Sequence, residues 1–471
     1  MNTKALRQKI LDLAIHGKLV PQDPNDEPAS VLLERIKAEK ERLIREGKIK
    51  RPKRAKAACD KPHYQKEDPF GIPDSWRWTT IEDIAESNIG LTYKPSDICD
   101  NGIPVYRSNN IQNRRIDITD LVRVDTKILN KQYLAIGDLL ICARNGSRRL
   151  VGKCAIIQEL SEPSSFGAFM AVCRSAYNPW IYLLLNTSYF DRYLDDSNST
   201  AINQVTQSML LTFRVPFPPK KEQDRIIEEV NKWFKLIETI EKRRENLQTA
   251  ISTTKSKLLD LAIHGKLVPQ DPNDEPASKL LKRINPKAEI ACDNAQYGKL
   301  PEGWCQCTLK DIGFFESGYA FSSDEYNPNG VPLIRISNIT NDGNIDLSSC
   351  VYIQDCNNSK VIIHEGDLLI AMSGATTGKM GIYRHKTNAL LNQRVGNLKC
   401  SEAWYQRHRD YFMYAKSGYI LKISYGGAQP NISAKAILDI KIDLPPLNEQ
   451  HRIVAKIEEL FAQLDGIAAA L

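Results

Sequence analysis

Side chains that hydrogen-bond to the edges of nucleic-acid bases are concentrated in a few short stretches of this sequence. RSNNIQNRR at 107–115 combines arginine with asparagine and glutamine, and ARNGSRR at 143–149 combines arginine with asparagine and serine. In the major groove of DNA, arginine pairs with guanine, and asparagine or glutamine pairs with adenine, often through two hydrogen bonds. The same side chains also bind phosphates, which adds affinity without sequence preference. These stretches therefore favour contact with DNA.

Similar polar stretches occur at NQVTQ (203–207), SGATTGK (373–379) and GGAQPNIS (426–433). The candidate DNA-binding residues in the first half of the chain are Arg107, Asn109, Asn110, Gln112, Arg114, Arg115, Arg144, Asn145, Ser147, Arg148, Arg149, Lys153, Asn203, Gln204 and Gln207. Those in the second half are Arg335, Ser337, Asn338, Ser373, Thr376, Thr377, Lys379, Gln429 and Asn431. The alternative for each is an ordinary polar surface loop, and Arg107 and Arg335 are equally suited to bracing their own loops.

No stretch has the residue types and spacing of a catalytic site. GATTGKM at 374–380 resembles a phosphate-binding loop, but it has three residues between its glycines and no Ser or Thr after Lys379. Asn178-Pro179-Trp180 resembles the Asn-Pro-Pro-aromatic motif of adenine methyltransferases with one proline too few, and no glycine-rich cofactor loop precedes it. The 11 cysteines include no CxxC pair, which favours reduced thiols over a zinc site. We therefore expect a chain that is non-catalytic by itself and binds no metal or cofactor.

The segments that must position these loops occur twice. LDLAIHGKLVPQDPNDEPAS at 11–30, the repeat block, returns without a change at 259–278. Weaker matches follow in the same order in both halves: IPDSW (72–76) with LPEGW (300–304), GIPVYRSNNI (102–111) with GVPLIRISNI (330–339), GDLLI (137–141) with GDLLI (366–370), and VPFPPKKEQDRI (215–226) with IDLPPLNEQHRI (442–453). The sequence therefore predicts two similar mixed α/β modules, module 1 over 71–218 and module 2 over 299–445. GDLLI predicts a buried strand in each, and residues of period two predict a closing strand at 211–217 and at 438–444.

A long helix is expected after each closing strand. Apolar residues recur at alternating spacings of four and three from Ile226, which is typical of a coiled coil. Prolines before position 220 suit a helix start, and His264-Gly265 suits a helix stop with glycine in the left-handed cap position. A helix over 220–264 would span ~65 Å at 1.5 Å per residue. The predicted seam comprises Ile226, Val230, Trp233, Ile237, Ile240, Leu247, Ile251, Leu258 and Leu261 centrally, Leu6, Ile10 and Leu13 at the N-terminus, and Ile453, Ile457, Leu460, Leu464 and Ile467 at the C-terminus.

The two chain ends together match the central helix. The last residue is the equivalent of position 244 (471 − 227), and the first is the equivalent of position 249 (1 + 248), which leaves about four residues missing between them. We expect the central helix to lie antiparallel to this terminal pair. The predicted fold class is α+β, with two mixed α/β modules joined and separated by long antiparallel coiled-coil helices in a pseudo-two-fold repeat. The expected segments are a helical segment (1–30), a basic linker (31–70), module 1, a central helical spacer (219–278), a second linker (279–298), module 2 and a C-terminal helix (446–471).

Composition places the chain among soluble globular proteins. Of its 471 residues 42% are hydrophobic and 26% are charged, and the net charge of +7 is compatible with a nucleic-acid partner. No run approaches the ~20 apolar residues of a membrane span, and the N-terminus lacks the apolar core of a signal peptide. We expect a cytoplasmic protein with no membrane contact. The run KIKRPKRAK at 48–56 suits either DNA contact or a solvated linker.

The order of these features resembles the specificity subunit of a type I restriction–modification enzyme. The resemblance rests on two modules that each open near (I/L)P-x-x-W, contain GDLLI and close on PP-x-x-EQ-x-RI, with a heptad helix between them. The repeat block is similar to the spacer regions of some members, and the resemblance covers essentially the whole chain.

The resemblance implies that each module is a target recognition domain that reads one half of a split DNA sequence. It further implies that the helical spacers dock two modification (methyltransferase) subunits, joined by restriction and translocation subunits. S-adenosylmethionine, ATP and Mg would then bind to those partners rather than to this chain. The alternatives are a coiled-coil scaffold with non-specific DNA binding, and a single-chain adenine methyltransferase or nuclease, which the missing motifs disfavour.

Overall fold

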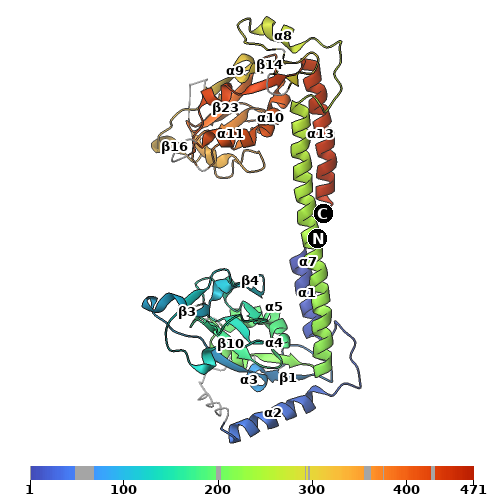
Figure 1. Ribbon diagram of the computed structural model, residues 1–471, viewed down its shortest axis with the longest axis vertical. Helices are drawn as coiled ribbons and strands as arrows, with labels where there is room; N and C mark the ends of the chain where they lie inside the picture. Colours follow the sequence, from blue (N-terminus) through green and yellow to red (C-terminus); the bar gives the residue numbers. More distant parts are fainter. Residues whose placement is uncertain are drawn as a thin grey trace. The chain divides into compact units, whose positions relative to one another are not determined.

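The computed structural model describes residues 2–47, 68–197, 203–291, 293–294, 298–354, 362–374, 376–425 and 430–470. The described chain divides into two compact units, Met1–Lys242 and Arg243–Leu471. Each unit holds one module and its share of the long helix α7 (Lys220–Ile263), as Figure 1 shows. The whole basic run at 48–56 lies outside the described residues, so its role stays open.

Module 1 is built on small sheets of mostly antiparallel strands. Its closing strand β11 (Arg214–Phe217) pairs with its opening strand β1 (Arg77–Thr80), so the module begins and ends at one place. A four-stranded antiparallel sheet has the order β2 (Glu86–Ile89), β10 (Met170–Arg174), β7 (Leu139–Cys142), β8 (Cys154–Ile156). A second sheet has the order β6 (Val122–Val124), β3 (Ile98–Tyr106), β9 (Ser165–Phe166), and β4 (Ile111–Gln112) forms a hairpin with β5 (Arg115–Ile116).

Helices enclose the core of module 1. The short helix α3 (Ile81–Ile84) follows β1, and three helices stand between β10 and β11: α4 (Asn178–Leu185), α5 (Ser188–Ser197) and α6 (Gln207–Thr212). Their apolar side chains join one core with those of α1 (Thr3–Ile15) and of the first turns of α7. Helix α2 (Ala29–Arg45) packs its buried residues Ala29 and Leu32 on the same core.

Module 2 repeats this plan with a larger second sheet. Strand β14 (Cys305–Thr308) pairs with β24 (Lys441–Leu444), and a four-stranded sheet has the order β15 (Gly313–Ser317), β23 (Val395–Cys400), β20 (Leu368–Ala371), β21 (Met380–Ile382). The second sheet has the order β16 (Tyr326–Asn327), β18 (Val351–Ile353), β17 (Val331–Ile334), β22 (Ala389–Leu391), β19 (Ile362–Ile363). Besides its part of α7, the second unit contains the helices α8 (Ala277–Ile284), α9 (Leu309–Ile312), α10 (Gln406–Ala415), α11 (Ser417–Ser424), α12 (Ala434–Leu438) and α13 (Leu447–Ala469). Around the start of module 2, β12 (Asp293–Asn294) pairs with β13 (Gly298–Lys299).

Each unit pairs its terminal helix antiparallel with its own part of α7 (Figure 1). In the first unit, Arg7 on α1 binds Glu241 at 2.6 Å, whereas Gln22, further along the chain, binds Glu222 at 3.1 Å. In the second unit, Asp465 near the end of α13 binds Lys255 at 2.5 Å. Glu449 near the start of α13 binds Gln270, just beyond α7. The predicted antiparallel pairing is thus confirmed within each unit.

Two details of the sequence predictions are corrected. Five predicted seam residues are exposed: Trp233, Ile240, Leu247, Leu261 and Ile467. The reason is that α7 contacts its module as well as a partner helix, so its buried face departs from a strict heptad; Phe234, off the seam, lies under the guanidinium groups of Arg7 and Arg114. The closing strands are also shorter than predicted, because Leu211 belongs to α6 and Leu438 to α12.

The predictions for the GDLLI strands and for the stop of the central helix are confirmed, whereas the expected linkers at 31–70 and 279–298 are partly helical, in α2 and α8. GDLLI forms the buried strands β7 and β20, each entered through a turn at a glycine with positive φ, Gly137 and Gly366. Helix α7 ends at Ile263, and both Gly17 and Gly265 adopt φ of +65° after their helices. A side chain at either glycine would collide with Pro73 or Pro301 and would sit in a strained backbone region. No helix among the described residues has the length and apolar character that a membrane span needs.

Candidate nucleic-acid interface

The two copies of the repeat block make the same contacts in their own units. Asp26 binds Arg225 at 2.6 Å, and its counterpart Asp274 binds Arg452 at 2.7 Å. Gln22 and Gln270 each bind a buried glutamate in the first turn of the following module's long helix, Glu222 and Glu449, at 3.1 Å. Burial raises the pKa of both glutamates. Each copy of the block therefore makes the same hydrogen bonds to the first turns of the long helix that follows its module.

The block also leaves the same side chains exposed in both units: Pro21 and Pro269, Asp23 and Asp271, Pro24 and Pro272, and Asn25 and Asn273. Asp23 and Asp271 each accept hydrogen bonds from the asparagine two residues later, at 2.9 and 3.0 Å. The two units therefore expose the same side chains in the same local conformation.

Four loops of module 1 meet where β3, β7 and β10 come together, and we name them loop surface 1: residues 107–109, 143–147, 167–169 and 203–204. The amide of Gly167 donates to the carbonyl of Tyr106 at 3.0 Å, and that of Arg144 donates to the carbonyl of Phe169 at 3.0 Å. The Asn145 side chain donates to the Ser108 hydroxyl at 3.2 Å, and Asn203 donates to the Gly146 carbonyl at 3.2 Å. The structure thus brings together predicted residues that lie almost 100 positions apart.

The equivalent loops of module 2 form loop surface 2: residues 335–337, 372–374, 392–394 and 430–431. The amide of Asn392 donates to the Ile334 carbonyl at 3.1 Å, and that of Met372 donates to the Arg394 carbonyl at 2.9 Å. Gly374 donates to the Pro430 carbonyl at 3.2 Å, and Ser373 forms a bridge with Asn431. Because these contacts match those of module 1, the two loop surfaces correspond position by position.

Two of the predicted DNA-binding residues have a structural role, because their side-chain amides are already hydrogen-bonded within the module. Asn110 and Asn338 are buried, and each accepts a hydrogen bond from the backbone of the arginine three residues before it, Arg107 or Arg335. Asn110 also donates to the carbonyls of Asp117 and Asp120. These two side chains hold their loops in shape and have no free edge for a base.

The guanidinium groups of Arg107 and Arg335 are half-buried at the loop surfaces. Arg107 lies 3.5 Å from Asp120, and Arg335 lies over the ring of Tyr326 at 5.9 Å. In both, the Nε atom is buried without a hydrogen-bond partner among the described residues. The contacts with Asp120 and Tyr326 therefore brace the two guanidinium groups, whereas their Nε–H groups donate no hydrogen bond within the described residues.

Several predicted residues lie away from the loop surfaces. Arg114 lies in the turn of the β4–β5 hairpin and Arg115 begins β5. The Arg114 guanidinium lies over Phe234, and Arg115 lies 3.4 Å from Glu238, both on α7. Arg148 pairs with Asp195 on α5 at 2.6 Å. Gln207 donates to the carbonyl of Ser87 at 2.5 Å. Their contacts within the chain compete with any contact to DNA.

The remaining predicted residues are placed as follows. Asn109 is exposed and donates to Asp120 at 2.6 Å, and Gln112 donates to the Asn109 carbonyl at 2.9 Å. Partial burial lowers the pKa of Lys153. Thr377 is buried and donates to the carbonyls of Gly374 and Pro430, which closes its loop. Ser147, Arg149, Ser337 and Asn431 are exposed, Gln204, Thr376 and Lys379 are half-buried, and Gln429 lies outside the described residues.

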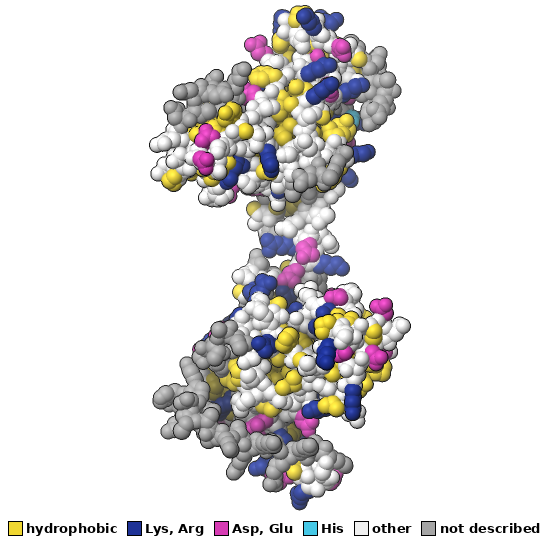
Figure 2. Space-filling model, turned by 90° about the vertical axis from the view of Figure 1, so that its left-hand side faces the viewer, with side chains coloured by type: hydrophobic (Ala, Val, Ile, Leu, Met, Phe, Trp, Pro, Cys, Tyr) yellow, Lys and Arg dark blue, Asp and Glu magenta, His cyan; other side chains and the backbone are white. Residues whose placement is uncertain are grey.

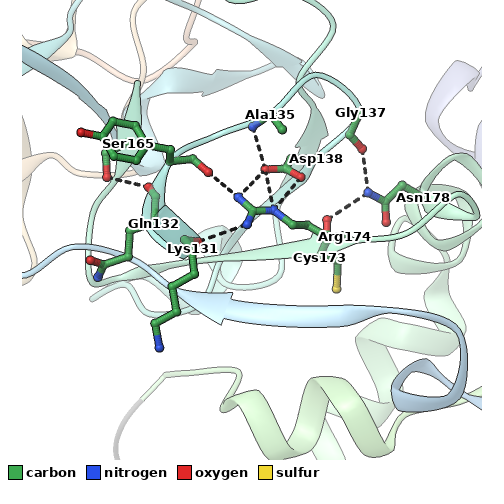
Figure 3. Close-up of polar contacts among 10 residues, drawn as sticks. Lys131, Gln132, Ala135, Gly137, Asp138, Ser165, Cys173, Arg174 and Asn178 are labelled. Carbon is green, nitrogen blue, oxygen red and sulfur yellow. Dashed lines mark hydrogen bonds and ion pairs between the residues drawn. The ribbon is translucent and has the colours of Figure 1, made fainter. Parts of the chain in front are cut away.

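The Asn-Pro-aromatic stretch belongs to the core, not to a catalytic site. Figure 3 shows that the Asn178 side chain donates to the carbonyls of Gly137 and Cys173, at 2.6 and 2.9 Å. Beside it, the Arg174 guanidinium holds the buried carboxylate of Asp138 at 3.0 Å. Module 2 places Lys399 and Asp367 in the same roles at 2.7 Å. Within the described ranges no group of His, Cys, Asp and Glu is suited to hold a metal ion.

Charge alone does not mark the interface. On the face shown in Figure 2, Lys and Arg side chains are spread over each unit with Asp and Glu among them. The loop surfaces are instead distinguished by their mixture of arginine, amide and hydroxyl groups. Two exposed residues within them, Phe169 and Arg394, were missed by the sequence analysis, because only the strand pairing brings them beside Arg144 and Ser373.

Comparison with known proteins shows the family of the chain. The family model for the type I restriction modification DNA specificity domain matches residues 73–249 and 301–469. The chain belongs to this specificity family. It is 31% identical to the type I restriction enzyme EcoAI specificity subunit of Escherichia coli over 97% of this chain and 88% of that one. It is 28% identical to the EcoEI specificity subunit of the same species, over 99% and 90%.

The fold agrees with the family. A chain from a study of complex assembly and conformational transition in the type I R-M system superposes with a TM-score of 0.60 at 17% identity, over 85% of this chain and 94% of that chain. The same family model matches both halves of the chain, which agrees with two modules that share one fold but differ in their loop residues.

Proposed function

We propose that this chain is the DNA specificity subunit of a type I restriction–modification complex, with module 1 and module 2 each reading one half of a split target. One observation carries the proposal: the loop surfaces correspond position by position in backbone contacts, yet their side chains differ. One backbone plan with two sets of hydrogen-bonding groups suits the reading of two different base sequences.

The chain is a non-catalytic part of that complex. Its relatives are specificity subunits, and its methyltransferase-like stretch at Asn178 is used for core hydrogen bonds. Adenine methylation with S-adenosylmethionine, and ATP- and Mg-dependent translocation and cleavage, would belong to partner subunits.

Two modification subunits would dock on the helices and repeat blocks. The repeat block exposes the same proline, aspartate and asparagine side chains in each unit, so one partner surface fits both. Apolar side chains on α7 point away from its packed face: Trp233, Leu236 and Ile240 in the first unit are between 37% and 49% exposed. Ile467 of α13, the counterpart of Ile240, is 49% exposed. Apolar residues exposed on a helix in this way are typical of a docking site.

Selection from a pool of random duplex DNA tests the proposed function. The complex of this chain with its modification subunit is incubated with the pool at rising salt concentration, and bound DNA is sequenced. We expect enriched molecules to share two short blocks at a fixed spacing, bound ~10³-fold or more above random DNA. A coiled-coil scaffold with non-specific binding would enrich no sequence, and its binding would fall steeply with salt. That result would reject the proposal.

A further inference from the structure

One pair of backbone-bonded positions at the loop surfaces differs between the modules in an unusual way. In module 1, Arg144 follows β7 and Phe169 precedes β10, and the Phe169 carbonyl accepts from the amides of Ala143 and Arg144 at 2.9 and 3.0 Å. In module 2, Ser373 follows β20 and Arg394 precedes β23, and the Arg394 carbonyl accepts from Met372 at 2.9 Å. The arginine therefore follows the GDLLI strand in module 1, whereas in module 2 it precedes the strand that pairs with the GDLLI strand.

Both arginines are exposed, and the module 1 pair has a defined geometry. The Arg144 guanidinium lies over the Phe169 ring, 5.6 Å from its centroid. The ring itself is 62% exposed, which is high for a phenylalanine held in a tight backbone turn. A cation over an aromatic face is stabilised at such a site, so Phe169 limits the directions in which Arg144 can point.

We propose that positions 144 and 169 in module 1, and 373 and 394 in module 2, determine one base in each half of the DNA target. Arg144 and Arg394 each donate two hydrogen bonds to the O6 and N7 atoms of a guanine, which is the commonest specific arginine contact. Phe169 is a positioning residue that holds the Arg144 guanidinium in the plane of the base. The inference rests on the proposed function, because it assigns bases within the same reading surfaces.

The neighbouring loop residues fit this geometry. Asn145 is tied to Ser108, and its backbone to Asn203, so the loop that carries Arg144 is held on two sides. In module 2 the loop that carries Ser373 is held by the Gly374–Pro430 hydrogen bond and by the bridge to Asn431. A rigid support for a base-reading side chain reduces the conformational entropy lost on binding.

The test maps methylated adenines in a host that expresses each variant with the modification subunit. Arg144→Ala should relax one guanine position of the first half, with about 10- to 100-fold less discrimination there, and leave the second half unchanged. Phe169→Leu should weaken discrimination at that same position by about two- to fivefold. Arg394→Ala should act on one guanine of the other half only.

A matched control and an exchange sharpen the test. Ile136 is 70% exposed at the opposite end of β7, so Ile136→Ala should leave both halves unchanged while removing a similar apolar surface. The double variant Arg144→Ser with Phe169→Arg gives module 1 the pair found in module 2. It should retain a folded complex and keep a preference for guanine in the first half, because the arginine of the module 2 pair also reads guanine, and loss of all preference there would overturn the inference.

The outcomes separate this inference from the function on which it rests. If the unaltered chain yields no split motif, the proposed function fails. If it yields a split motif but Arg144→Ala leaves the first half unchanged, only the inference fails. A first half without guanine, relaxation spread over both halves, or an equal effect of Ile136→Ala would likewise overturn the inference.

Discussion

We expect the length of α7 to set the unread gap between the two half-sites. We consider a deletion of residues 243–249. The side chains of residues 242–250 are all exposed, so the deletion removes no buried contact. Seven residues at 1.5 Å each shorten the helix by ~10 Å. The same length of straight DNA holds about three base pairs at 3.4 Å each.

The deletion also changes how the second module is rotated relative to the DNA groove that it reads. A heptad is ~20° short of two full helical turns, so the deletion barely rotates the following helix segment. Three base pairs, by contrast, turn the DNA groove by about 100°, since one turn takes ~10 base pairs. We therefore expect the preferred gap to shrink by two or three base pairs and the methylation rate to fall.

Mapping of methylated adenines measures the gap directly, and native mass spectrometry confirms that the variant still assembles with its modification subunit. Duplication of residues 243–249 is the matched control, because it should lengthen the gap by a similar amount. An assembled deletion variant that methylates the original motif with an unchanged gap would refute the idea that α7 acts as a ruler.

Three further results are expected. Replacing residues 71–218 with a module of another specificity should change one half of the target, and a change in both halves would show that the modules do not read independently. Joining the C-terminus to the N-terminus through about four residues, with new ends opened in an exposed loop, should preserve folding and methylation; unfolded protein by circular dichroism would contradict the match between chain ends and central helix. Burial lowers the pKa of His408 to about 3, and Trp404 donates to its Nδ1 at 3.2 Å, so the histidine stays neutral when folded. Because the unfolded chain binds this proton below its ordinary pKa near 6.5, the free energy of unfolding of the second unit should fall by ~1.4 kcal/mol per pH unit from about 6.5 down to 3. Denaturant titrations of wild type and His408→Gln would check this slope, and equal slopes would contradict it.

Features with a repeated or periodic signature could be predicted from the sequence. The repeat block, the GDLLI strands, the helix stops at Gly17 and Gly265 and the span of α7 depend on local patterns that one chain shows twice. The antiparallel pairing followed from matching the chain ends to the central helix, which is also a pattern in sequence alone.

Features that depend on tertiary contacts could not be predicted from the sequence. The heptad pattern put Trp233 and Ile240 in the seam, but α7 divides its surface between α1 and module 1, which leaves both side chains exposed. Asparagine is a residue type that reads bases, yet the Asn110 amide donates its hydrogen bonds to the carbonyls of Asp117 and Asp120. Phe169 has no local signal at all, because its place beside Arg144 arises from the pairing of β7 with β10.

The most direct test of the central claim is a genome-wide map of methylated adenines in a host that expresses this chain with its own modification subunit. The account predicts one split motif, with two short specific halves around a fixed unread gap. Methylation without a split motif, or none from a complex shown to be assembled, would contradict it and favour a scaffold that does not read sequence.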